Sequence, residues 1–247
     1  MYKIIKETKD YLVIEKEAGV IVHPGSGIED LTLIEEIAKK YPKIKKVGDD
    51  PLRPGIVHRL DREASGLMVI ALNQKSFLDL KKQFQDREIV KEYKVLVYGQ
   101  IEKEKGTIDF PIKRAASGHK MAAMPKSNGD NYKNPRARGN MIASLDAREA
   151  ISSFKVEKKF INYTLLKVNI KTGRTHQIRV HMFAYGHPVV GDSLYCTKKT
   201  KAKNKKLNLN RIFLVAQKLE FTDLKGEKQS FGIDLPPDLS EFLSKIK

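Results

Sequence analysis

The sequence contains a single cysteine, Cys196, among its 247 residues. One cysteine excludes an internal disulfide and a cysteine-based zinc site, and it suits a reducing compartment, so we expect a cytoplasmic protein. The N-terminal residues lack the apolar core of a signal peptide, and no apolar run is long enough to span a bilayer. We therefore expect no membrane partner.

Motifs for cofactors and for familiar nucleophiles are also missing. No glycine-rich phosphate loop of either nucleotide-binding type occurs, which argues against a nucleotide cofactor. His176 and His181 are five residues apart and would point in different directions on a helix, so we expect no metal site. Ser65 does not have the flanking glycines of a nucleophile elbow. These absences argue against chemistry that depends on ATP, NAD, a metal ion or a serine nucleophile.

Basic residues are abundant. The formal net charge is +17 and the isoelectric point is near 9.7. Such a surface favours polyanions, and nucleic acid is preferred over an acidic membrane because no basic amphipathic helix stands out. The simpler alternative is a lysine-rich surface that is merely solvated.

Hydrophobic periodicity predicts a mixture of strands and helices. The predicted strands cover residues 11–14, 20–22, 67–72, 91–99, 151–170, 211–221 and 229–235. The predicted helices begin after Thr32, after Asn73, near His176 and at Asp238. Polar, irregular composition predicts loops or insertions at about 114–150 and 197–208. No repeat and no clear linker is found, so we expect one domain over residues 1–247 and a monomer.

The stretch from Pro54 to Gly66 concentrates two arginines, a histidine and two carboxylates just before a predicted buried strand. A polar loop on a rigid scaffold is a common way to present catalytic side chains, and Asp61 is the candidate for the chemistry. Each residue also has a structural explanation. Asp61 can cap a turn or pair with an arginine, His58 can be a loop hydrogen-bonding group, and Tyr93 can be a core tyrosine.

Four separated stretches resemble the RluA family of pseudouridine synthases. They are GVIVHPG at 19–25, HRLDREASG at 58–66, KEY at 91–93, and GRTHQIRVH at 173–181 followed by GHP at 186–188 and GD at 191–192. Their order and rough spacing match the family over nearly the whole chain. The resemblance implies an α/β (α+β) pseudouridine synthase fold, with a central, mixed, mainly antiparallel sheet, flanking helices and a basic catalytic cleft.

The resemblance also implies an activity, the isomerisation of uridine to pseudouridine in structured RNA. Asp61 resembles the aspartate that acts beside the sugar or base, Arg179 the buried arginine that pairs with it, and Tyr93 the tyrosine that stacks on uracil. No cofactor is needed, because the reaction uses no redox step and no phosphoryl donor. Ribosomal RNA is the first expectation for the target and transfer RNA the second. The alternatives are a non-catalytic RNA-binding or ribosome-assembly protein on the same fold, and a generic basic scaffold.

The RNA path is expected to involve a second group of residues. Arg59 has the planar head suited to filling the gap left by an extruded uridine, although a phosphate contact is the simpler reading. The other expected RNA-binding residues are His58, Arg62, Arg174, His176, Lys198 and Lys199. The tract from Lys198 to Lys206 carries six lysines and is expected to be a loop that either holds phosphates or is merely solvated.

The sequence departs from the family pattern at three positions. Glu17 stands where the family usually has proline, Ala64 where it has threonine, and Val215 where a histidine is common. We expect these changes to affect loop rigidity and packing rather than the reaction. Many relatives carry an N-terminal S4 RNA-binding domain, whereas this chain is expected to start directly at the catalytic domain and to capture RNA with the core itself.

Overall fold

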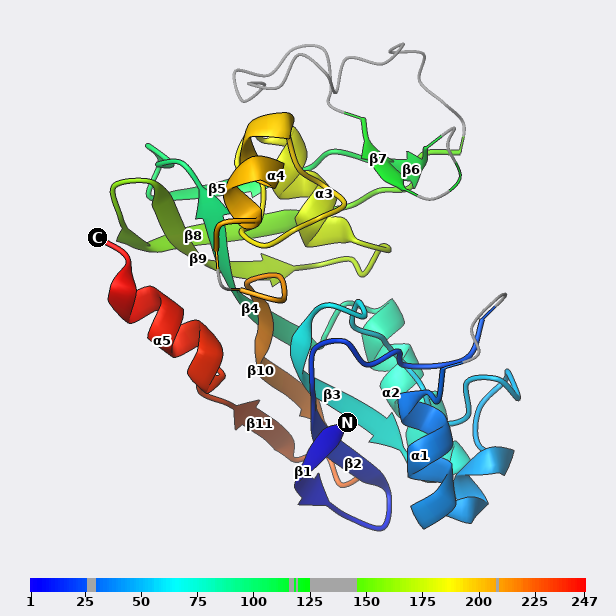
Figure 1. Ribbon diagram of the computed structural model, residues 1–247. Coiled ribbons are helices and arrows are strands. Elements are labelled where there is room, and N and C mark those ends of the chain that lie inside the picture. The colour runs from blue at the N-terminus through cyan, green and yellow to red at the C-terminus, as the bar shows by residue number, and fades with distance from the viewer. Residues whose placement is uncertain (26–29, 116–117, 119, 125–145, 208) are drawn as a thin grey trace. The chain divides into compact units, whose positions relative to one another are not determined.

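The computed structural model describes residues 1–25, 30–115, 118, 120–124, 146–207 and 209–247 (Figure 1). These residues form two compact units, unit 1 with residues 1–91 and 215–234 and unit 2 with residues 92–214 and 235–247. Each unit combines β-sheet and helices, and within the units the strands pair antiparallel except for β3 and β10 of unit 1, which are parallel. The expected α/β fold class with a mixed, mainly antiparallel sheet is confirmed, whereas the single domain stays a prediction.

Unit 1 is built on the strand order β1-β2-β3-β10, and β11 pairs with β10. The strands are β1 (Tyr2–Glu7), β2 (Tyr11–Lys16), β3 (Ser65–Ala71), β10 (Leu214–Thr222, whose first residue belongs to unit 2) and β11 (Lys228–Gly232). Its helices are α1 (Leu33–Lys40), the 3-10 helix η1 (Pro42–Lys46) and α2 (Gln74–Gln85). All seven residues of β3 are buried, so this strand runs through the core of the unit.

Local signals explain where the helices of unit 1 begin. Thr32 and Glu35 form a capping box at the start of α1, and the Asn73 side chain accepts a hydrogen bond from the Ser76 N–H at the start of α2. Both caps satisfy N–H groups that would otherwise have no partner in the first turn. The predicted helices after Thr32 and Asn73 are confirmed.

Unit 2 has the antiparallel strand order β4-β9-β8-β5. These strands are β4 (Val90–Tyr98, whose first two residues belong to unit 1), β9 (Tyr163–Ile170), β8 (Ser152–Lys159) and β5 (Lys105–Ile108). A separate hairpin pairs β6 (Ile112–Arg114) with β7 (Met121–Ala123). The helices are α3 (Gln177–Ala184), α4 (Lys198–Asn204) and α5 (Pro237–Lys245). No helix among the described residues has the length and hydrophobicity needed to cross a membrane.

Three sequence predictions about secondary structure are corrected. Residues 20–22 form no strand, because the carbonyls of Ile21 and Val22 accept hydrogen bonds from the first N–H groups of α1. The predicted loop at 114–150 contains β7, while residues 116–117, 119 and 125–145 lie outside the described part.

The predicted loop at 197–208 also contains a helix, α4. The Thr197 hydroxyl accepts from the Thr200 N–H at 3.1 Å, and the Thr200 hydroxyl accepts from the Thr197 N–H at 2.9 Å. This reciprocal cap, together with burial of Thr200, outweighs the absence of a hydrophobic face on the lysine tract.

Candidate functional site

The loop of residues 57–64 carries Asp61 and leads directly into β3 of unit 1. Leu60 and Ala64 are buried on either side of Asp61, which is half-buried, and the Ala64 N–H bonds to the Asp61 carbonyl at 3.2 Å. Gly66, the second residue of β3, has φ +119°, and a Cβ there would lie 2.3 Å from the Ala216 carbonyl oxygen. Only glycine allows this contact between the β3 and β10 backbones, and the contact fixes the end of the Asp61 loop.

The Lys16 side chain is hydrogen-bonded to the same loop. Its side chain is fully buried at the end of β2, and its Nζ donates to the carbonyls of Glu17, Val20 and Arg62 at 2.8, 2.9 and 3.3 Å. Three carbonyl acceptors satisfy the three donors of an ammonium group. The lysine therefore joins the turn at 17–20 to the end of the Asp61 loop.

Arg59 is exposed and is oriented by His23. The His23 Nδ1 lies 2.7 Å from the Pro24 carbonyl and so must donate, which leaves Nε2 as the acceptor for the Arg59 Nη1 at 3.2 Å. Burial lowers the pKa of His23, and the positive charge of Arg59 lowers it further. The imidazole is therefore neutral near pH 7 and can accept the arginine's hydrogen bond.

His58 points away from Arg59 into its own packing site. Its Nε2 accepts from the Val69 N–H of β3 at 3.1 Å, and its ring stacks on Phe84 of α2 with centroids 4.7 Å apart. Burial lowers the pKa of His58 to about 3, and the nearby Lys91, whose own pKa burial lowers to about 8, contributes to the shift. In unit 1 this histidine fixes the loop to β3 and α2. The expectation that it contacts RNA stays a prediction.

Arg179 lies on α3 in unit 2, where Asp192 holds its guanidinium. Its Nε and Nη2 donate to the two Asp192 carboxylate oxygens at 2.7 and 3.0 Å, and both side chains are almost completely buried, at 1% and 0% exposure. The same carboxylate accepts the N–H groups of Leu194 and Tyr195 at 2.8 and 2.9 Å. Four donors on one carboxylate stabilise its charged form in a buried place.

Asn204, the last residue of α4, connects this ion pair to the rest of unit 2. Its Oδ1 accepts from the Gly191 N–H at 3.0 Å and the Tyr98 hydroxyl at 2.6 Å, and its Nδ2 donates to the Asp192 carbonyl at 2.9 Å. The amide therefore braces the turn that carries Asp192. Helix α4, the lysine-rich segment, is thus joined to the residue that holds Arg179.

His176 and Tyr195 complete the surroundings of Arg179. The His176 Nδ1 lies 3.0 Å from the Tyr195 hydroxyl, which also accepts from the Met121 N–H at 2.8 Å, and the Tyr195 ring lies 5.4 Å from the Arg179 guanidinium carbon. His176 has φ 55° and precedes the first residue of α3. This left-handed conformation is uncommon outside glycine, and here it stands at the start of the helix that carries Arg179.

Tyr93 is buried on β4 opposite Val168 of β9, as its position in the alternating strand predicts. Asp61 belongs to unit 1, whereas Tyr93 and Arg179 belong to unit 2. The structure thus describes the two halves of the predicted site separately. The pairing of Arg179 with Asp61 stays a prediction. A guanidinium has five N–H groups, and two of those of Arg179 donate to Asp192.

The remaining predicted RNA-binding residues lie on the surface or near it. Arg62 donates to the Gly19 carbonyl and pairs with Asp30 at 3.3 Å, and Arg174 donates to the Glu149 carbonyl at 3.0 Å. Lys198 and Lys199 are exposed in the first turn of α4. No group of histidine, cysteine, aspartate or glutamate in the described part of the chain has the arrangement of a metal site.

The three departures from the family pattern fall in places that tolerate them. The Glu17 side chain is 67% exposed and pairs with the N-terminal amine at 3.2 Å. Ala64 and Val215 are buried, and Val215 pairs in register with Ser65 of β3. A valine in place of histidine therefore extends the apolar core beside the Asp61 loop.

Sequence reasoning did not find the roles of Lys16, Asp192, Asn204 or Tyr195. Asp192 lies in one of the quoted motif stretches, so the motif marks it without indicating its partner. Asn204 had no sequence signal, because an amide that braces a distant turn cannot be recognised from its neighbours in a lysine tract. Lys16 follows an apolar strand, which alone does not predict burial of an ammonium group.

Comparison with known proteins gives a consistent result. Residues 10–184 match the family model described as RNA pseudouridylate synthase. An uncharacterized RNA pseudouridine synthase of Aquifex aeolicus is 39% identical over 99% of this chain and 72% of its own length. The ribosomal large subunit pseudouridine synthase D of Nitrosomonas europaea is 34% identical over 99% of this chain and 65% of its own length.

Two solved structures share the fold. The first is human RNA pseudouridylate synthase domain containing 1, with a TM-score of 0.72 and 24% identity over 96% of this chain and 84% of that chain. The second is human RNA pseudouridylate synthase domain containing 4, with a TM-score of 0.74 and 22% identity over 99% of this chain and 93% of that chain.

Proposed function

Because this chain belongs to the RNA pseudouridylate synthase family, we propose that it isomerises specific uridines to pseudouridine in structured RNA, with ribosomal RNA as the first candidate and transfer RNA as the second. The match of the family model to residues 10–184, with Asp61 in place in its loop, carries the proposal. Relatives that carry the name ribosomal large subunit pseudouridine synthase D favour ribosomal RNA as the target.

The reaction breaks the bond between ribose and uracil N1, turns the base, and rejoins it to the sugar through C5. A carboxylate beside the sugar or base supplies the nucleophile or the electrostatic stabilisation, and we assign this role to Asp61. We assign the pairing cation to Arg179, whose guanidinium Asp192 holds in one orientation. A guanidinium that is fixed in one orientation can meet a carboxylate with charge-assisted hydrogen bonds.

Tyr93 is assigned to the uracil ring, against which its aromatic face would stack while the C5 proton leaves. Its place on β4, buried among paired strands, gives the ring a fixed position. Fixed groups that meet the reacting base in one geometry are more effective than mobile ones.

Arg59 is assigned to the gap left by the extruded uridine. A uridine in folded RNA must leave its stack, which costs a few kcal/mol, and a planar guanidinium can take its place. The neutral Nε2 of His23 accepts a hydrogen bond from this guanidinium, so the Arg59 side chain is exposed to solvent but held in one orientation. The exposed lysines of α4, Lys198 and Lys199 among them, are assigned to phosphates.

Tritium release from RNA that carries [5-³H]uridine tests this proposal. The substrates are ribosomal and transfer RNA from cells that lack the gene, so that the target sites are unmodified, and pseudouridine mapping then identifies the uridine. Release from ribosomal RNA is expected. Tight RNA binding without release from either RNA would favour the non-catalytic RNA-binding alternative.

A further inference from the structure

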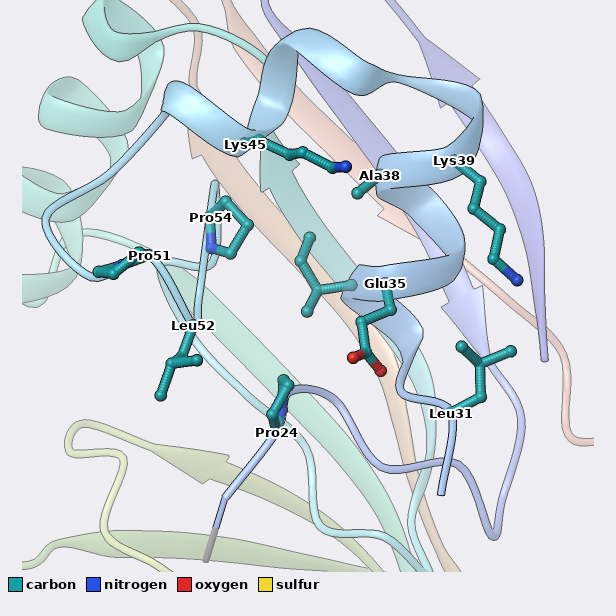
Figure 2. Close-up of a pocket in the computed structure, with 10 residues that line it drawn as sticks. Pro24, Leu31, Glu35, Ala38, Lys39, Lys45, Pro51, Leu52 and Pro54 are labelled. Atoms are coloured by element: carbon teal, nitrogen blue, oxygen red, sulfur yellow. The ribbon is translucent and has the colours of Figure 1, made fainter. Parts of the chain in front are cut away.

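Unit 1 contains a pocket of about 530 Å³ that none of the assigned residues lines. It opens between α1 and the loop of residues 51–54 (Figure 2). Its volume lies in the range of small-ligand sites, about 300–1,000 Å³. The pocket is thus large enough for one nucleotide unit and separate from the Asp61 loop chemistry.

Apolar side chains form much of its wall and are unusually open to solvent. Leu31 is 43% exposed and Leu52 is 57% exposed, and the half-buried Pro24 and the exposed Pro51 line the same pocket (Figure 2). Single exposed leucines are common, but two of them that line one pocket with prolines form a surface against which a planar base can pack.

The loop that carries Leu52 is held in place before any ligand binds. The Asp50 carboxylate accepts from the Leu52 N–H at 2.9 Å and pairs with Arg53 at 3.3 Å. Gly55 follows with φ +70°, and a Cβ there would lie 2.3 Å from the Ala71 carbonyl oxygen, which fixes the loop end against β3. A preorganised wall reduces the entropy lost on binding.

The charge at the rim indicates an anionic partner. Lys39 and Lys45 both line the pocket, and five lysines occur between residues 39 and 46. Lys45 forms no ion pair with any described residue. The one carboxylate in the lining, Glu35, is engaged by the Thr32 N–H and hydroxyl at 2.8 and 2.7 Å, so it serves the cap of α1.

The pocket also adjoins the group that orients Arg59. Its wall residue Pro24 accepts the His23 Nδ1–H at 2.7 Å, and His23 in turn lies 3.2 Å from Arg59. An RNA stack that receives the Arg59 side chain in place of the extruded uridine would therefore have neighbouring nucleotides close to this pocket. Single-stranded nucleotides near a modified site are the parts of RNA that proteins read most readily.

We propose that this pocket binds an unstacked nucleotide of the substrate RNA near the target uridine, with the base against Leu31 and Leu52 and the phosphate at Lys45. The inference rests on the proposed function, because it takes RNA as the substrate. It adds a binding site in unit 1 that is independent of the chemistry at Asp61.

The test uses the full chain with Asp61→Asn, so that binding is measured without turnover, and an in vitro transcript of the large-subunit ribosomal RNA as probe. Lys45→Gln is compared with Lys43→Gln, an exposed lysine of the same 3-10 helix η1 outside the pocket. Leu52→Ser is compared with Leu78→Ser, a leucine of α2 that is 53% exposed. All four sites are on the surface, and circular dichroism verifies folding.

Leu52→Ser is expected to raise the Kd at least about fivefold with no change in its salt dependence. Lys45→Gln is expected to lower the slope of log Kd against log salt by about 0.7–0.9, the share of one phosphate contact. The two controls are expected to leave affinity and slope near those of the parent.

Parent-like binding by both Lys45→Gln and Leu52→Ser, while the wild-type chain releases tritium, would overturn the pocket and leave the proposed function intact. A wild-type chain that neither binds the RNA nor releases tritium would instead overturn the proposed function, and the pocket with it.

Discussion

Replacement of Asp192 by asparagine is the sharpest test of how Arg179 is held. The change removes one charge from a pair whose side chains are 1% and 0% exposed. All four partners of the carboxylate are donors, namely the Arg179 Nε and Nη2 and the N–H groups of Leu194 and Tyr195. An asparagine offers one oxygen and turns its own NH₂ toward other donors, so the buried guanidinium loses the negative charge of its Asp192 partner.

The expected cost follows from that geometry. Breaking a buried ion pair by removing one partner costs about 3–5 kcal/mol. With an m-value of about 3 kcal/mol per M, the urea midpoint falls by about 1–1.7 M. The sequence contains no tryptophan, so far-UV circular dichroism is the suitable probe of unfolding.

Asp238→Asn provides the matched control in unit 2. Asp238 is 50% exposed and pairs with Arg211 at 3.9 Å, and exposed pairs contribute about 0–1 kcal/mol. If Asp192→Asn lowered the midpoint no more than Asp238→Asn, the buried pair would not be the element that fixes Arg179, and the assignment of Asp192 would be wrong.

Three further outcomes are expected. In urea unfolding, Gly191→Ala should destabilise the protein by ~2 kcal/mol or more beyond Gly226→Ala, and equal losses of stability would contradict this. Both glycines have φ near +81°, but only at position 191 would a Cβ meet a backbone oxygen, that of Arg211 at 2.1 Å. Burial lowers the pKa of His181 to about 4 from 6.5, so the unfolded state binds more protons below pH 6.5, and this histidine alone accounts for a loss of about 2 kcal/mol of stability between pH 7 and pH 5. His181→Gln should reduce the loss of stability over this range by that amount, and an unchanged loss would refute this assignment. Arg59→Ala should lower kcat/KM more for folded RNA than for a short single strand with the same uridine, because only in folded RNA must the uridine be unstacked. An equal decrease in kcat/KM for both substrates would indicate a phosphate contact instead.

Much of the fold could be predicted from sequence because its signals are local. The caps at Thr32 and Asn73 and the alternation around Tyr93 act within a few residues. Residues 20–22 were misassigned because their apolar run suits a strand, whereas tertiary structure uses their carbonyls to cap α1. The helix at 198–204 was missed because its stability comes from a threonine cap and the Asn204 bonds rather than from a hydrophobic face.

The site residues also divide into those that sequence motifs identify and those that only the fold brings together. Asp61, Tyr93 and Arg179 were identified through the family motifs, and the structure places Tyr93 and Arg179 in buried positions. What sequence did not predict is how these residues are held. The partner of Arg179 within unit 2 is Asp192, 13 positions away, and the partner of Arg59 is His23, 36 positions away. Contacts between distant positions depend on the fold, so spacing alone does not reveal them.

We propose that Asp61 carries out the isomerisation, while Arg59 on the same loop fills the gap left by the extruded uridine. The most direct measurement is tritium release from [5-³H]uridine-labelled ribosomal RNA by Asp61→Asn, together with the Kd of the same variant for that RNA. Asparagine keeps the size of the side chain and removes its charge and nucleophilicity. We predict a complete loss of release with a Kd within about threefold of wild type. Release at the wild-type rate by Asp61→Asn would contradict the account.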